Sequence, residues 1–362
     1  MRCLIIQNRL GLDGRSRCVV EFVRLLNELG VEPQVFCLAY EDSDIGRAFG
    51  VTGLRYSLSR VFTGRPAVTA FSPEVLLSNL LAGRMIRDTR PDLVFNSNCV
   101  WTFLPAGPRY IHYIHFSLKA VIREFPRYQS GFWKAYGRIL RRFIADRVPP
   151  HSLFVANSEL VRAGLREDQG LDSMVVYPPS WHGELQPCRP ERRRVVTVGA
   201  FRSDKRQLEQ IEIARRLPDW SFTLLGAIGS RRYTRAVERA ASGLSNVTVE
   251  TNPTRGRIDE ELGRASHFLH THRTEGFGIA VVEAAAAGCV PIVPDSGGVR
   301  EIVEPAELRF DTIAGCVDAL RETSGELGCR LLGTVQERLP RFSDDAFRAA
   351  LKEVLVEERA IA

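Results

Sequence analysis

The sequence of 362 residues lacks any apolar run near the ~20 residues that a transmembrane helix requires. Its first residues lead directly into the apolar Leu4-Ile5-Ile6 and do not have the layout of a signal peptide. The length allows two domains, each with a core of its own. We therefore expect a cytoplasmic protein with two domains.

No C-x-x-C pair occurs among the eight cysteines, which are scattered singly and in several cases lie within apolar runs. This pattern argues against a zinc site and against a disulfide framework. It predicts reduced, packed thiols at Cys3, Cys18, Cys37, Cys99, Cys188, Cys289, Cys316 and Cys329.

A G-x-G-x-x-G motif is also missing after the first predicted strand, residues 2–7. The loop Gly11–Arg15 leads instead into an amphipathic helix that ends near Gly30. The sequence therefore lacks the fingerprint of dinucleotide binding, which argues against a nicotinamide-dependent enzyme.

Basic side chains are in clear excess over acidic ones in only one segment. The net charge is +6, and residues 119–148 alone hold eight basic and two acidic side chains. Aromatic and aliphatic residues recur among the arginines at helical spacing, which is the composition of a helix on an anionic membrane. The main alternative is a solvated basic face whose apolar stripe packs on its own domain. Nucleic acid is a weaker third hypothesis, and we do not expect it as a partner.

What the sequence does contain is a regular alternation of strands and helices, which is typical of parallel α/β sheets. The later predicted helices include residues 231–241, 258–262 and 279–287. The predicted strands after the first one span residues 34–38, 91–95, 110–114, 153–157, 195–198, 221–226, 247–250, 267–270 and 290–294.

Residues 268–298 carry the strongest functional signal. A short strand, a glycine-bearing turn, an alanine-rich helix and a second strand follow one another, and ligands of such sheets bind at the carboxyl ends of the strands. Gly276 and Gly278 precede the helix, whose free N–H groups can bind an anion. Glu275 and Glu283 flank this position and favour hydroxyl groups as partners. One acid on each side of a phosphate site predicts a nucleotide sugar as the ligand.

The spacing of Glu275 and Glu283, together with Ser296-Gly297-Gly298, resembles the E-x7-E signature of retaining GT-B glycosyltransferases of family 4. The nearest likeness is to the GDP-mannose-dependent branch that extends a dolichol-linked oligosaccharide. The resemblance implies two Rossmann-like domains that face each other across a cleft. It also implies that Glu275 contacts the transferred sugar and Glu283 the ribose. The residues it implies for the sugar and the diphosphate are Gly276, Phe277, Gly278 and Ile279.

The resemblance extends over most of the chain. It implies that Arg202 and Lys205, which follow a predicted strand, hold the diphosphate, and that Asn252 lies beside the base. In the first half it implies that Gly14 and Arg15 face the donor, and that His115, at a strand end, lies near the reacting centre. His112, within the strand, is expected to be packed.

The domain boundaries follow from composition and from the resemblance. Residues 183–194 are rich in Pro, Arg and Glu without apolar periodicity, which predicts a linker between domains 1–182 and 195–342. Ser343 is expected to cap a last helix. The resemblance implies that residues 343–362 cross back to the first domain.

The activity implied is retaining transfer of a hexose, with mannose as the lead hypothesis, to a glycan, a lipid-linked acceptor or another hydroxyl. Neither a metal nor another cofactor is expected. Asp42 and Asp44 form a D-x-D, the metal motif of the other large glycosyltransferase fold, but the parallel α/β pattern argues against that role. The alternatives are a phosphorylase or sugar-nucleotide epimerase of the same fold, and a nucleotide-sugar-binding protein without catalysis.

Overall fold

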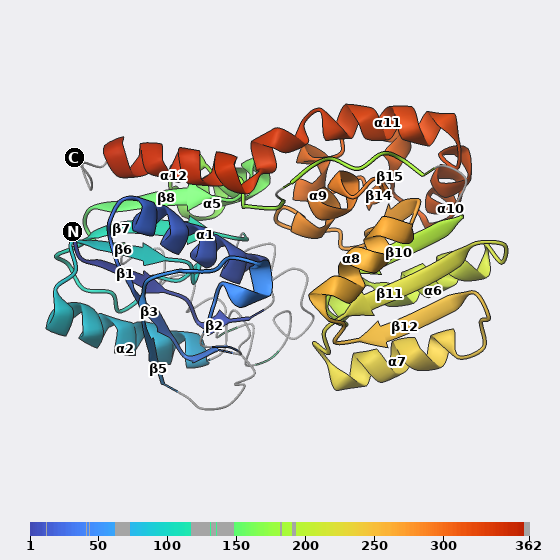
Figure 1. The fold of residues 1–362 in the computed structure, drawn as a ribbon. Helices are drawn as coiled ribbons and strands as arrows, with labels where there is room; N and C mark the ends of the chain where they lie inside the picture. The colour runs from blue at the N-terminus through green and yellow to red at the C-terminus, as the bar shows by residue number, and fades with distance from the viewer. Residues whose placement is uncertain are drawn as a thin grey trace. The chain divides into compact units, whose positions relative to one another are not determined.

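The computed structural model describes residues 1–11, 13–40, 42, 44–61, 73–116, 131, 135, 148–181, 183–189 and 193–357. The chain forms two compact units, shown in Figure 1. Unit 1 comprises Met1–Pro179 and Asp344–Ala362, and unit 2 comprises Ser180–Ser343. Residues 183–189 of the predicted linker thus belong to unit 2.

Unit 1 is built on a seven-stranded sheet in the order β5-β3-β1-β6-β7-β8-β9, and all of its strand pairs are parallel. Strands β2 and β4, which follow β1 and β3 in the sequence, form a separate two-stranded parallel sheet. The strands are β1 (Cys3–Ile6), β2 (Arg9–Leu10), β3 (Gln34–Cys37), β4 (Ala39–Tyr40), β5 (Ser57–Arg60), β6 (Leu93–Asn96), β7 (Arg109–Ile114), β8 (Ser152–Ala156) and β9 (Met174–Val175).

Both faces of this sheet are covered, which explains why its central strands read as continuous apolar runs. In β1, Cys3 and Ile5 belong to one hydrophobic core, whereas Leu4 and Ile6 belong to another. This alternation follows from the two-residue period of a strand. The first core is completed by α1 and α12 and the second by α2 and α5.

The helices of unit 1 are α1 (Gly14–Glu28), α2 (Pro73–Thr89), α5 (Glu159–Gln169) and α12 (Asp344–Glu357). Asp13 caps α1, because its Oδ1 accepts a hydrogen bond from the Ser16 N–H at 2.8 Å. Phe347 and Leu351 of α12 are buried in the same core as α1. Figure 1 shows these two helices side by side. The last helix of the sequence therefore belongs to the first unit.

Unit 2 contains a six-stranded parallel sheet in the order β12-β11-β10-β13-β14-β15. Its strands are β10 (Arg194–Val198), β11 (Ser221–Gly226), β12 (Val247–Thr251), β13 (His267–Leu269), β14 (Val290–Pro294) and β15 (Arg309–Phe310). Its helices are α6 (Gln207–Arg215), α7 (Arg231–Ala241), α8 (Arg255–Arg264), α9 (Ile279–Ala286), α10 (Ile313–Glu322) and α11 (Glu326–Gln336). Two parallel, doubly wound sheets confirm the α/β class with two Rossmann-like units that was expected from the sequence.

Each sheet reverses its strand order once, and ligands of doubly wound sheets bind outside the carboxyl ends of the strands at that point. In unit 1 the order reverses between β1 and β6, and in unit 2 between β10 and β13. The loops after these four strands are therefore where a site is expected. The loops after β10 and β13 contain Lys205 and Glu275.

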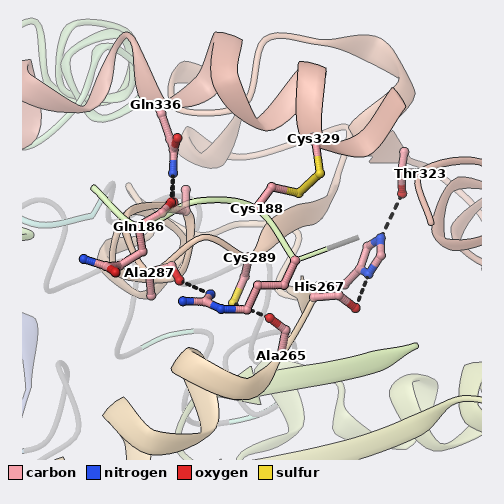
Figure 2. The surroundings of a disulfide bond; sticks show 12 residues. Gln186, Cys188, Ala265, His267, Ala287, Cys289, Thr323, Cys329 and Gln336 are labelled. Atoms are coloured by element: carbon pink, nitrogen blue, oxygen red, sulfur yellow. Dashed lines mark hydrogen bonds between the residues drawn. A yellow bond between two sulfur atoms is a disulfide. The ribbon is translucent and has the colours of Figure 1, made fainter. Parts of the chain in front are cut away.

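The expectation that all cysteines are reduced is wrong for two of them. Cys188 and Cys329 form a disulfide across 141 residues of sequence, as Figure 2 shows. Single cysteines reveal no pairing, because proximity across such a distance is set only by the fold. The other six are free, and all but the partly exposed Cys99 are buried.

This disulfide ties the segment that enters unit 2 to α11. The same segment is hydrogen-bonded to the carboxyl end of α9. The Gln186 N–H donates to the Ala286 carbonyl at 2.8 Å, and Arg189 donates to the Ala287 carbonyl at 2.7 Å. Gln336 of α11 donates to the carbonyl of Gln186 at 2.9 Å (Figure 2). The disulfide therefore holds together the groups that satisfy the end of α9.

Loss of the disulfide is expected to lower the free energy of unfolding of unit 2 by about 2–5 kcal/mol, because a long loop is freed in the unfolded chain. Denaturant unfolding of the protein before and after treatment with dithiothreitol measures this change. The double variant Cys188→Ser/Cys329→Ser is the control, since the reductant should not destabilise it further. Equal stability of the oxidised and reduced wild-type protein would contradict the prediction.

No helix in the described part of the chain is long and apolar enough to cross a membrane. The basic region 119–148 lies outside the described residues except for Gly131, Ala135 and Val148. Its proposed contact with an anionic membrane therefore stays a prediction.

Candidate functional site

In unit 2, the structure brings Lys205 and Glu275 into direct contact. Lys205 ends the short 3-10 helix Ser203–Lys205 after β10, and Glu275 lies in the turn after β13. The Lys205 Nζ donates to Glu275 Oε2 at 2.5 Å and lies 3.1 Å from His272 Nδ1. The Thr271 hydroxyl donates to the Lys205 carbonyl at 2.6 Å and thereby joins the two loops. The pair lies where the strand order reverses.

Glu275 is ionised in this setting. Burial alone would raise the pKa of its carboxyl, but Lys205 and His272 hold that pKa well below its ordinary value. The Glu275 side chain is only 21% exposed, and a carboxylate removed from water to this extent requires compensating charge or hydrogen bonds, which the protein supplies through a cation. Glu275 can therefore accept hydrogen bonds from hydroxyl groups throughout the neutral pH range.

Arg202 lies in the same loop and pairs with a different acid. Its Nε donates to Asp204 Oδ1 at 2.9 Å, and its Nη2 contacts the second oxygen of the same carboxylate. Burial would raise the pKa of Asp204, but Arg202 lowers it. The stem of Arg202 lies against Gly229, where a Cβ would come within 2.4 Å of its Cγ. The guanidinium is thus held beside the Lys205 loop.

The amino end of α9 carries the glycines that the sequence singled out. Gly278 adopts φ +112°, and a Cβ there would meet Val299 at 2.7 Å. No side chain among the described residues caps this helix. Its first N–H groups, at Ile279 and Ala280, have no acceptor within the helix and can face an anion.

Ser296, Gly297 and Gly298 fix the turn that contains Glu275. The Gly298 N–H donates to the Glu275 carbonyl at 2.8 Å, and the Ser296 hydroxyl donates to the Arg273 carbonyl at 2.9 Å. A Cβ at Gly298 would lie 2.0 Å from the Gly276 carbonyl oxygen. The Ser-Gly-Gly motif therefore allows the backbone at Gly298 to lie close to the backbone at Gly276.

Phe277 has a packing role that the sequence did not indicate. Its side chain is buried and makes an edge-to-face contact with Phe342 at a centroid distance of 5.2 Å. A ligand contact at Phe277 is thus limited to the backbone.

Glu283 lies on α9 and pairs with Arg255 of α8 rather than with Lys205. The Arg255 Nη1 donates to Glu283 Oε1 at 2.7 Å, and the Glu283 side chain is 12% exposed. Asn252, in the loop before α8, adopts φ +52° and accepts the Ile228 N–H on its Oδ1 at 3.2 Å. Each acid of the E-x7-E pair thus has a separate cation.

The predicted residues of unit 1 gather at the end of its sheet. Gly14 begins α1, and Arg15 pairs with Asp13 at 3.3 Å. His115 follows β7, is 9% exposed, and its Nε2 lies 2.8 Å from the hydroxyl of Ser97, which follows β6. His115 thus lies beside the loop after β6, which is one of the two strands between which the strand order reverses.

His115 is neutral at physiological pH. Burial lowers the pKa of its imidazole to about 3, and the charge of Arg15 adds to this effect. His112 is fully buried, and burial lowers its pKa to about 3. It lies between Asn96 and Ser152 at 3.0 and 3.1 Å, so it is packed as expected.

One set of described side chains has the composition of a metal site: His270, His272 and Glu275, whose ligand atoms lie within 4.8 Å of one another. Lys205 Nζ, however, lies against two of the three, so an ammonium already fills the place of a cation. The set does not fit a metal ion beside this charge. Asp42 and Asp44 of the D-x-D both pair with Arg47, at 3.1 and 3.8 Å.

Three site residues were missed from the sequence: Asp204, Arg255 and His272. Asp204 is separated from Arg202 by one residue, which could have indicated an ion pair. His272 alternates with His270 just after a strand, and this repeat was the only signal. Nothing in the sequence connects Arg255 with Glu283, because they approach through two different helices.

Two family models match the chain. The model described as Glycosyltransferase Family 4 matches residues 12–179, and the model described as Glycosyl transferases group 1 matches residues 186–322. The matches together cover most of both units.

Two curated relatives are mannosyltransferases. The chain is 28% identical to the mouse GDP-Man:Man(3)GlcNAc(2)-PP-Dol alpha-1,2-mannosyltransferase over 206 residues, which are 49% of this chain and 42% of that protein. It is 29% identical to the Xanthomonas campestris GDP-mannose:cellobiosyl-diphosphopolyprenol alpha-mannosyltransferase over 118 residues, 30% of each chain. The chain thus matches less than half the length of these relatives.

Solved structures agree in fold over nearly the entire chain. Sucrose-phosphate synthase from Thermosynechococcus elongatus gives a TM-score of 0.77 at 14% identity, and the match covers 100% of both chains. WaaG, a glycosyltransferase involved in lipopolysaccharide biosynthesis, gives 0.73 at 14% identity, covering 96% of this chain and 98% of that one. At such identity the likeness concerns the fold alone.

Proposed function

Because the chain belongs to glycosyltransferase family 4 and has the GT-B fold, we propose that it transfers a hexose from a nucleotide diphosphate sugar to a hydroxyl acceptor. Mannose from GDP-mannose is the lead hypothesis, supported by the likeness to two GDP-mannose-dependent enzymes. The proposed acceptor is a glycan or a lipid-linked saccharide, since those relatives act on lipid-linked substrates by name.

The observation that carries this proposal is the contact of Lys205 with Glu275 beside the amino end of α9. It places a cation in contact with an ionised acid, and that acid lies in the turn just before the N–H donors of α9. A diphosphate can interact with the cation and the N–H donors, and a sugar hydroxyl can donate to the acid. This set suits a sugar diphosphate better than either a free sugar or a free phosphate.

The proposed chemistry follows from these charges. The diphosphate gains negative charge as the glycosidic bond breaks, and Lys205, Arg202 and the N–H groups at Gly278 and Ile279 would stabilise it. Glu275 would accept from a hydroxyl of the transferred sugar and Glu283 from the ribose. His115 is neutral and can therefore hydrogen-bond to the sugar without adding charge.

We further propose that transfer retains the anomeric configuration and uses no metal. Glu275 and Glu283 each engage a cation, which supports binding roles rather than attack on the anomeric carbon. Attack from the front face, with the departing phosphate accepting the acceptor proton, fits this arrangement. Lys205 would supply the positive charge at the phosphate that a metal supplies in other enzymes.

A panel of sugar nucleotides tests the donor. We expect GDP-mannose at a concentration of ~100 Kd to raise the apparent free energy of unfolding by about 2.7 kcal/mol, because it binds only the folded protein. Differential scanning with GDP-, UDP- and ADP-sugars at equal concentration compares the candidates.

A transfer assay with the best donor then separates the remaining possibilities. Transfer of mannose with retained configuration, read by NMR of the anomeric proton, is the expected result. Inversion, epimer formation without an acceptor, or binding without transfer to any extract would each contradict the proposal. Stabilisation by UDP-sugars alone would reject GDP-mannose but not glycosyl transfer.

A further inference from the structure

His272 connects the two ion pairs of the candidate site. Its Nδ1 lies 3.1 Å from Lys205 Nζ and 3.0 Å from Glu275 Oε2. Its Nε2 lies 3.3 Å from the Thr274 hydroxyl and 3.9 Å from Asp204 Oδ2. The imidazole is also 9% exposed, so bulk water screens these interactions little.

The two contacts of Nδ1 require different protonation states. An ammonium has no lone pair and can only donate, so the contact with Lys205 is a hydrogen bond only while Nδ1 carries no hydrogen. Its lone pair then also faces the Glu275 carboxylate, which can only accept. This second contact becomes a hydrogen bond only when Nδ1 gains a proton.

The Lys205 ammonium cannot fully neutralise both Glu275 and the diphosphate of a bound donor. Lys205 contacts the partly buried Glu275 at 2.5 Å and neutralises its charge. A diphosphate that draws Lys205 toward itself leaves Glu275 with less compensating charge, and it adds negative charge of its own nearby. Both changes favour a positive charge on the imidazole between them.

We propose that His272 takes up one proton from solvent at Nδ1 when the donor diphosphate draws Lys205 away, and that the imidazolium then holds Glu275 in position for the sugar. His272 would thus be a positioning residue. The inference rests on the proposed function, because it requires a diphosphate at Lys205. The proton is the only atom transferred, and no bond between heavy atoms changes.

The other groups around His272 agree with a gain of charge. The carboxylate of Asp204 faces Nε2 and also accepts from Arg202 through both of its oxygens. The ring of His270 lies 6.2 Å away, but burial lowers the pKa of His270 to about 3, so it stays neutral. With Lys205 displaced, the groups that face His272 include the carboxylates of Asp204 and Glu275, the hydroxyl of Thr274 and the neutral ring of His270.

Proton uptake on binding sets the sign of the pH dependence. Because the bound state holds more protons, affinity for the donor must fall as pH rises through the interval between the two pKa values of His272. With one proton, the limit is a tenfold rise in Kd per pH unit.

Calorimetric titration of the full chain with GDP and with GDP-mannose tests this inference. The binding enthalpy is measured at one pH in PIPES and in Tris, whose ionisation enthalpies differ, and the difference gives the number of protons taken up. The variant His272→Asn keeps an amide near the Nδ1 position but cannot titrate. His270→Asn is the matched control, since it removes the neighbouring imidazole from the same strand end.

We expect proton uptake by the wild type and by His270→Asn, and none by His272→Asn, whose Kd should also lose its pH dependence. Thermal unfolding of each variant verifies that it is folded. Binding without proton uptake by the wild type, or loss of uptake in His270→Asn but not in His272→Asn, would overturn the inference and leave the proposed function intact. If no sugar nucleotide or nucleoside diphosphate binds at all, the proposed function fails, and this inference fails with it.

Discussion

Replacing Lys205 by alanine is expected to lower kcat by ~10²–10³-fold, the usual cost of removing one preorganised group that stabilises developing charge. Lys205 is proposed to contact the diphosphate most strongly as it departs, so the loss should be larger in kcat than in the affinity for the donor. Initial rates of transfer from the donor identified above, over a range of donor concentrations, separate the two parameters.

The adjacent cation provides a matched control. Arg206 forms a partly exposed pair with Glu209 at 3.0 Å, and Arg206→Gln removes a charge from the same loop without touching the Glu275 contact. It should leave kcat within about twofold, since exposed ion pairs contribute little. A Lys205→Ala variant with near-normal kcat would refute the role of Lys205 in charge stabilisation. An equal loss in both variants would instead indicate that the loop as a whole is disturbed.

Replacing Asp344 by alanine is expected to destabilise unit 1 by about 3–5 kcal/mol, because it removes the carboxylate that the buried Arg17 guanidinium contacts. Asp344 begins α12, and both of its carboxylate oxygens accept from Arg17 Nη2 on α1, at 3.0 and 3.1 Å. Both side chains are less than a tenth exposed. Native-state hydrogen exchange of the amides in α1 and α12 measures the effect on unit 1 by itself.

Asp345 is the control for this prediction, because it lies one residue further along and its side chain is 88% exposed. Asp345→Ala removes a surface pair with Arg348 and should cost at most about 1 kcal/mol. Similar protection of the α1 amides from hydrogen exchange in the Asp344→Ala variant and in the wild type would mean that Arg17 contacts another partner or solvent in the variant. The buried pair would then not hold the last helix on unit 1.

The interpretation of residues 268–298 from sequence shows why one part of the site could be predicted. A strand, a turn and a helix each form from residues that are close in sequence. Glycines before a helix adopt the backbone conformations that leave the first N–H groups of the helix accessible. The strand β13, the helix α9 and the strand β14 lie within about two residues of their predicted bounds. The sequence predicts both Lys205 and Glu275 as site residues, and the structure places them in contact.

The partners of these residues could not be predicted in the same way. The contact of Glu283 with a ribose hydroxyl stays a prediction, and nothing in the sequence indicated that Arg255 reaches Glu283 from a separate helix. Phe277 stands among ligand-type residues in the sequence, but its side chain packs on Phe342. Such contacts depend on the angles between packed elements, which no short-range pattern encodes.

The sequence by itself determined the parallel α/β class, the positions of the central strands and the glycine turn before α9, because periodicity and backbone stereochemistry act over a few residues. Only the tertiary structure decided that Cys188 bonds to Cys329, that α12 joins α1 through Arg17 and Asp344, and that His272 lies between Lys205 and Glu275. Those groups are far apart in the chain or come from separate loops. Their approach is fixed by the order of strands in each sheet and by the burial of apolar faces, both of which are properties of the whole folded unit.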